Sequence, residues 1–202
     1  MRRLNKLYCV QNMFWDYFTF GWEHIMSWGA WDHLLFVAAL ISIYTARDFR
    51  KIIILVTAFT IGHSITLALA SLGHISIRSA LVEFLIPLTI LLTALYNVVN
   101  KQDKYQRMFP NYLLALGFGL IHGLGFAGSL MSLLGKTSSL VIPLLGFNIG
   151  LEIGQILVVI MLLLISWFLE KYLKARHHEL SIFINGGAFF ASFIMLTERW
   201  PF

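Results

Sequence analysis

The sequence has 202 residues, of which 58% are hydrophobic and only 12% are charged. A soluble globular domain carries about 25% charged residues, so this composition excludes an ordinary soluble domain and indicates an integral membrane protein. The net charge of +5 does not indicate a nucleic-acid partner, and we expect none, because membrane proteins concentrate Lys and Arg in their cytoplasmic loops.

The first 27 residues differ from the rest of the chain because they are rich in aromatic side chains and interrupted by polar ones. Trp and Tyr favour the membrane surface, so residues 7–27 are predicted to form a helix lying in the interface. Polar residues such as Asp16 interrupt any long apolar core, so we expect no cleaved signal peptide. Cys9 is the only cysteine, which excludes an internal disulfide bond and a thiolate metal cluster.

The remaining residues divide into apolar runs of membrane-spanning length. A span needs about 20 apolar residues, so about six spans fit with short loops and no separate soluble domain. The predicted fold is therefore all-α, a polytopic bundle of about six transmembrane helices preceded by the interfacial segment 1–27, in one domain over residues 1–202. The predicted spans are residues 28–45, 52–72, 80–99, 111–134, 139–168 and 181–197.

Basic residues predict the orientation of these spans. The loops after spans one, three and five contain nine of the 15 Lys and Arg residues, whereas the loops after spans two and four contain two. Since cytoplasmic loops carry the excess of Lys and Arg, the odd loops are predicted to face the cytoplasm and the N-terminus the outside.

Three predicted spans contain histidines, and an ionisable group within a span is by default a candidate functional residue. Asp32 and His33 lie about one turn inside the first span. His63 lies in the second span, on the helical face that also carries hydroxyl side chains such as Ser64. His122 lies in the glycine-rich stretch 116–128 of the fourth span, where glycines allow helices to approach closely.

The fifth span has two different faces. Asn148, Glu152 and Gln155 are spaced i, i+4, i+7 and share one face. Gly146, Gly150 and Gly154 lie on roughly the opposite face, which predicts close packing within one chain or in a homo-oligomer.

The depths of these polar groups predict a site inside the membrane. With a rise of about 1.5 Å per residue, His63, His122 and Glu152 all come to lie near the bilayer midplane, with His33 nearer the outer surface. Imidazoles and carboxylates are ligands for Zn²⁺, Ni²⁺ or Co²⁺-like ions. The polar residues predicted to surround and orient these ligands are Ser64, Glu83, Asn148 and Gln155. His177 and His178 are predicted to be a solvated pair, and His74 has no predicted role.

Several segments in order resemble the HupE/UreJ family of small bacterial membrane proteins, which is associated with hydrogenase and urease gene clusters. They cover roughly residues 21–160 and include G-W-E-H-I-M-S-W-G-A-W-D-H-L-L-F, T-A-F-T-I-G-H-S-I-T-L-A-L-A, V-E-F-L-I-P-L, F-G-L-I-H-G-L-G-F-A and F-N-I-G-L-E-I-G-Q. The founding members carry H-P-x-x-G-x-D-H in the first span. This chain matches it with His24, Asp32 and His33, without the Pro and with longer spacing.

The resemblance implies a nickel or cobalt permease in the bacterial inner membrane, with His24, Asp32 and His33 as metal ligands. Reasoning from the residues leaves two alternatives open. One is an intramembrane zinc-type metalloenzyme, a hydrolase or acyl transferase in which Glu152 or Asp32 acts as general base on a lipid or lipidated substrate. The other is an assembly subunit whose buried polar groups only fix helix packing.

Overall fold

The computed structural model describes residues 2–99, 108–134 and 140–201, and these residues form helices joined by turns and short connections. The prediction of an all-α bundle is confirmed. The helices are α1 (Arg2–Met26), α2 (Trp31–Ile41), the 3-10 turn η1 (Ala46–Asp48), α3 (Phe49–Ser71), α4 (Ser79–Val99), α5 (Met108–Leu134), α6 (Val141–Tyr172) and α7 (His177–Glu198).

Five of these helices, α3 to α7, are long and apolar enough to cross a membrane, and the protein is a multi-pass membrane protein. Each coincides with a predicted span to within four residues at either end. The predicted first span over residues 28–45 is not one continuous helix. That region contains the 11-residue helix α2, which makes a membrane-spanning length only together with the end of α1, across a bend of 69°.

The bend between α1 and α2 has a local cause. The α-helical hydrogen bonds of α1 end where Ser27 N donates to Glu23 O, and Ala30 N then closes a tight turn onto Ser27 O. Gly29 lies within this turn with open space around its Cα. Trp28 and Gly29 lack regular helical hydrogen bonds, so α2 starts afresh at Trp31 in a new direction.

Close approach through glycine fixes α3 against α5. A Cβ atom at Gly62 would overlap the backbone of Leu116, and one at Gly119 would overlap the backbone of Phe59. Small residues that let two backbones meet in this way are the usual device for packing membrane helices. Gly117 and Gly128 of the stretch 116–128 take no part in this contact, because an added Cβ at either would meet open space.

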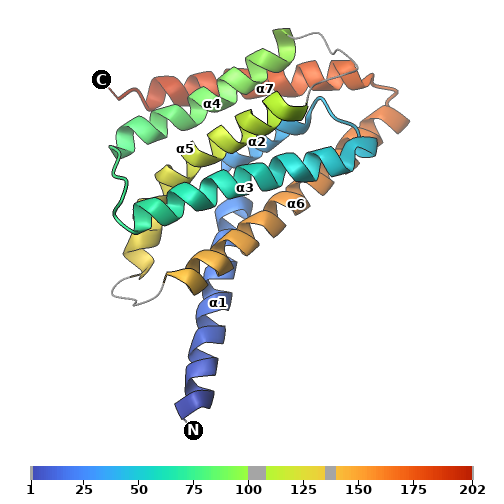
Figure 1. Cartoon of the computed structure of the whole chain (residues 1–202). Helices are drawn as coiled ribbons and strands as arrows, with labels where there is room; N and C mark the ends of the chain where they lie inside the picture. Colours follow the sequence, from blue (N-terminus) through green and yellow to red (C-terminus); the bar gives the residue numbers. More distant parts are fainter. Residues whose placement is uncertain (1, 100–107, 135–139, 202) are drawn as a thin grey trace.

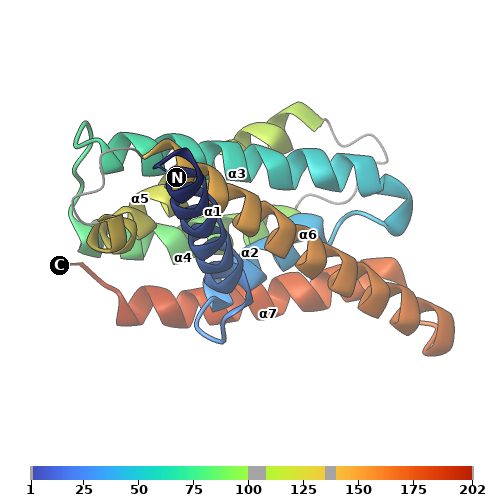
Figure 2. The same ribbon diagram turned by 90° about the horizontal axis from the view of Figure 1, so that it is seen from below.

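The glycine face of α6 packs in the same way against α1. Cβ atoms at Gly146 and Gly150 would overlap the backbones of Phe14 and Phe18, so this face is covered within one chain. In Figure 1, α1 runs across the direction of α3, α4 and α7, and its N-terminus points away from the bundle. The view from below in Figure 2 shows α1 nearly end-on where it crosses α6. The interfacial location of this helix stays a prediction.

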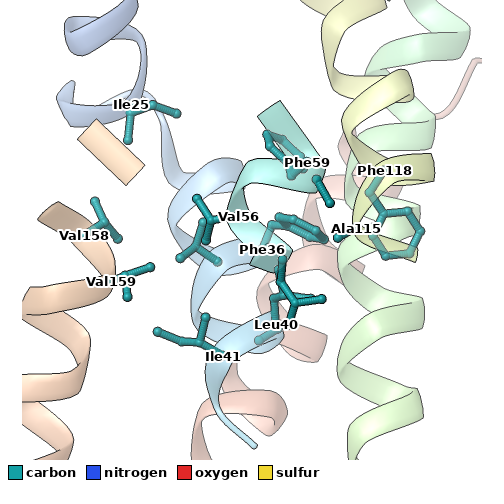
Figure 3. Packing of buried hydrophobic residues seen from close by; sticks show 14 of the residues in the cluster. Ile25, Phe36, Leu40, Ile41, Val56, Phe59, Ala115, Phe118, Val158 and Val159 are labelled. Atoms are coloured by element: carbon teal, nitrogen blue, oxygen red, sulfur yellow. The ribbon is translucent and has the colours of Figure 1, made fainter. Parts of the chain in front are cut away.

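Side chains from α2, α3 and α5 form the centre of the hydrophobic core. Figure 3 shows Phe36 of α2 beside Phe59 of α3, with Phe118 of α5 to the right of both. Phe36 and Phe59 have ring centroids 5.0 Å apart and are almost completely buried. Leu40, Ile41 and Val56 belong to the same buried cluster.

A hydrogen-bond network ties α2 to α4 and α7. Asn97 Nδ2 donates to Ala39 O at 2.8 Å and to Asn185 Oδ1 at 3.1 Å, and Asn185 Nδ2 donates to Ser42 Oγ at 2.7 Å. Because Asn185 is only 1% exposed, its bond to Ser42 forms in a buried place where it is stronger than in water. The network therefore fixes the short helix α2 at its C-terminal end.

Candidate metal centre

Histidines from four different helices gather at one place. His24 of α1 and His33 of α2 have ring centroids 4.6 Å apart, and His33 and His122 of α5 have centroids 5.0 Å apart. His63 of α3 lies 6.1 Å from His24 by the same measure. We call His24, His33, His63 and His122 the histidine cluster.

Backbone geometry brings these four side chains together. The turn at residues 27–30 folds α2 back so that His24 and His33, nine positions apart, become ring neighbours. On the other side, a Cβ atom at Gly123 would overlap the backbone oxygen of His63, so α5 carries His122 against α3 at its point of closest approach. The positions of these four side chains thus depend on the glycine contacts between α3 and α5 and on the bend between α1 and α2.

The cluster is enclosed, and several of its nitrogens have no hydrogen-bond partner. His63, His122 and His33 are 0%, 2% and 5% exposed, and His24 is partly buried. Within the described residues, both ring nitrogens of His63, Nε2 of His122 and Nε2 of His24 are buried and make no hydrogen bond. A buried polar atom without a partner costs about 1–3 kcal/mol, so four of them at one place are a candidate site for binding a ligand.

Asp32 orients one imidazole of the cluster. Its Oδ1 atom lies 2.9 Å from His33 Nδ1 and also accepts from the backbone N–H of His33 at 2.8 Å. A carboxylate in this position holds the proton on Nδ1 and leaves Nε2 free to coordinate a metal. The other carboxylate oxygen lies 4.0 Å from the guanidinium of Arg199, beyond the end of α7.

Phenylalanines enclose the cluster, and this feature was not predicted from the sequence. Phe126 lies 4.1 Å from His24 between ring centroids, and Phe147 stacks on both Phe126 and His63 at 4.8 and 5.9 Å. A signal was available, because three of the histidines have a Phe three or four residues away on the same helical face, at positions 36, 59 and 126. These rings exclude water from the cluster and lower its local dielectric constant.

The spacing of two cluster nitrogens suits a shared ion. His33 Nε2 and His122 Nδ1 are 3.5 Å apart. Two imidazole nitrogens bound at 2.0–2.1 Å to one tetrahedral ion are separated by about 3.4 Å. Within the described part of the chain, no group of three or more His, Cys, Asp or Glu side chains is arranged to hold a metal ion as it stands. Coordination by a third imidazole therefore requires a ring rotation in His24 or His63.

The structure does not bring Glu152 into the histidine cluster. Its Oε1 atom accepts a hydrogen bond of 2.6 Å from Thr57 of α3, and no described histidine or other cationic side chain lies within 4.0 Å of it. The neighbouring Gln155 accepts from Thr60 at 2.9 Å, and Asn148 donates to Leu144 O of its own helix. These α6 side chains form a separate polar group.

The other predicted polar neighbours also lie elsewhere. Ser64 donates to Thr60 O within α3, and Glu83 is exposed and accepts from Ser79 near the start of α4. His74 is exposed in the turn after α3. His177 departs from the predicted solvated pair, because it lies 2.9 Å from Glu170 at the junction of α6 and α7.

A bundle of apolar helices around buried, mutually facing imidazoles defines a polytopic membrane protein with a candidate site for a transition-metal ion. The family model described as HupE / UreJ protein matches residues 2–198, and the chain belongs to the HupE/UreJ family. The comparisons with curated proteins and with solved structures gave no match.

Proposed function

We propose that the protein is a permease for a divalent transition-metal ion of the nickel and cobalt class, and that the histidine cluster binds this ion as its substrate. Membership of the HupE/UreJ family, which is associated with nickel and cobalt transport, supports this function. The observation that carries the proposal is the 3.5 Å separation of His33 Nε2 and His122 Nδ1 inside a group of four imidazoles.

The imidazole ligands of the cluster favour a transition-metal ion over Mg²⁺ or Ca²⁺. Imidazole nitrogen is a good ligand for Ni²⁺, Co²⁺ and Zn²⁺ and a poor one for Mg²⁺ or Ca²⁺, which prefer oxygen. The carboxylate of Asp32 holds His33 Nδ1 and leaves its Nε2 for the ion. A site built mainly from neutral imidazoles also releases its ion more readily than a thiolate site, as a permease requires.

The burial of the four rings supports entry from the side of the α1–α2 bend. His24 is partly exposed beside this bend, whereas His63 and His122 are almost fully enclosed behind it. An incoming ion would meet His24 first and exchange water for imidazole stepwise. The residues nearest this entrance are the ones that the family resemblance implies as ligands, namely His24, Asp32 and His33.

We further propose that the protein lies in the bacterial inner membrane with its N-terminus outside. The beginning of α3 and the end of α6 lie at the same end of the bundle in Figure 1, and they carry Arg50, Lys51 and Lys171. A shared basic end supports a cytoplasmic location for it. The predicted basic loop with Lys101, Lys104 and Arg107 lies outside the described residues.

The test is metal flux in proteoliposomes that contain the purified protein and an enclosed Ni²⁺-sensitive dye. Wild-type protein should admit Ni²⁺ faster than empty liposomes, and His122→Ala should abolish this difference. The matched control is His74→Ala, because His74 is exposed and remote from the cluster, and it should transport normally. Flux equal to that of empty liposomes, or full flux in His122→Ala, would refute the proposal. Binding without flux would favour the metalloenzyme.

A further inference from the structure

The polar group on α6 is a second, independent concentration of buried polar atoms in the bundle. Its members are Thr57 and Thr60 of α3 and Asn148, Glu152 and Gln155 of α6. Within the described residues, Glu152 Oε2, Asn148 Oδ1 and Gln155 Nε2 are buried atoms without a hydrogen bond. We call these five residues the oxygen group, since their side chains offer hydroxyl, amide and carboxylate oxygens.

Glu152 has no cationic partner among the described residues. Among the described residues it accepts a hydrogen bond from the neutral hydroxyl of Thr57, and no described Lys, Arg or His lies within 4.0 Å of its carboxylate. A carboxylate inside an apolar bundle is very costly unless a proton or a cation neutralises it. Gln155, which is 1% exposed, already accepts from Thr60 through Oε1, and its unpartnered atom is the Nε2 donor, so the oxygens without a partner are those of Glu152 and Asn148.

Thr57, Thr60, Glu152 and Gln155 lie between the histidine cluster and the basic end of the bundle, whereas Asn148 follows Phe147, which stacks on His63, and lies at the level of the cluster. Thr60 and Thr57 precede His63 by three and six residues on α3, which is about 4.5 and 9 Å along the helix axis. Both lie on the way to Phe49, where α3 begins. An ion that leaves the cluster toward this end would therefore pass these oxygens next.

We propose that the oxygen group is a second, weaker station for the transported divalent cation, on its release path toward the basic end. This proposal rests on the proposed permease function. Oxygen ligands bind nickel-class ions less tightly than imidazoles do, while the charge of Glu152 attracts the ion out of the cluster. Binding of a cation there also supplies the positive charge and the ligand contacts that the unpartnered oxygens lack.

The test separates binding at the cluster from movement through the protein, using Glu152→Gln. This variant keeps the shape of the side chain and removes its charge. Equilibrium Ni²⁺ binding in detergent should stay as in wild type, whereas flux into proteoliposomes should fall about tenfold, the loss expected for one charge-assisted contact. Glu170→Gln is the control, because Glu170 lies on the same helix beside His177, away from the oxygen group, and its flux should be unchanged.

Each other outcome has a definite meaning. Wild-type flux in Glu152→Gln would overturn the second station, and the permease function would stand. Loss of equilibrium binding in Glu152→Gln to the extent seen in His122→Ala would also overturn it, because Glu152 would then belong to a single site with the imidazoles. Absence of Ni²⁺ flux in wild-type protein would overturn the permease function and the second station with it.

Discussion

The glycine contact between α3 and α5 allows a quantitative test of how the histidine cluster is positioned. In a Gly119→Ala variant, the new Cβ would lie 2.9 Å from the carbonyl carbon of Phe59 and 3.0 Å from His63 N, in addition to its overlap with Phe59 O. Comfortable contacts are about 3.5–4.0 Å and the overlap with Phe59 O is the deepest, so α3 and α5 must separate by about 1 Å or more. Backbone atoms cannot yield alone, and overpacking of this kind costs about 1–3 kcal/mol.

This separation moves His63 away from the rest of the histidine cluster. We expect Gly119→Ala to lower the midpoint of thermal unfolding in detergent and to weaken Ni²⁺ binding by about tenfold, which corresponds to 1.4 kcal/mol. The control is Gly117→Ala on the same helix, where the added Cβ meets nothing within 4 Å and neither property should fall. Equal stability and equal Ni²⁺ affinity in the two variants would refute the reasoning that close packing positions the cluster.

Three further predictions follow from named contacts. Asp32→Asn should weaken Ni²⁺ binding about 10–100-fold, measured by calorimetric titration, because His33 loses the carboxylate that fixes its tautomer. Asn185→Ala should destabilise the protein by about 1–3 kcal/mol in denaturant unfolding while Ni²⁺ affinity stays unchanged, since this network lies away from the cluster. Gly150→Val should weaken the α1–α6 contact and expose α1 to protease, whereas Gly187→Val, which projects into open space, should not. Wild-type Ni²⁺ affinity in Asp32→Asn would contradict the first prediction, and wild-type stability in Asn185→Ala would contradict the second. Wild-type resistance to protease in Gly150→Val would contradict the third.

The spanning helices were predictable because each is an uninterrupted apolar run bounded by charged or turn-forming residues. The ends of α4, for example, were predicted to within one residue. The division of residues 28–45 was not predictable in this way. The bend arises from backbone hydrogen bonds around Ser27 and Ala30, which the apolar content of the segment does not record.

Part of the site was also predictable. Depth arithmetic correctly placed His63 and His122 at one level, and the structure brings both into contact with Phe59. Depth says nothing about rotation of a helix about its own axis, and this is why Glu152 was predicted among the imidazoles. The glycine face of α6 packs on α1, and the resulting rotation directs Phe147 to His63 and Glu152 to Thr57.

The central claim is that imidazoles from separate helices bind one divalent ion inside the bundle. X-ray absorption spectroscopy of purified, Ni²⁺-loaded protein tests it most directly, because imidazole rings give a recognisable scattering pattern around the metal. We predict one tightly bound ion per chain with at least two imidazole ligands, and loss of both the ion and the pattern in the His33→Ala, His122→Ala double variant. A bound ion surrounded only by oxygen, or a double variant that keeps the imidazole pattern, would contradict the account.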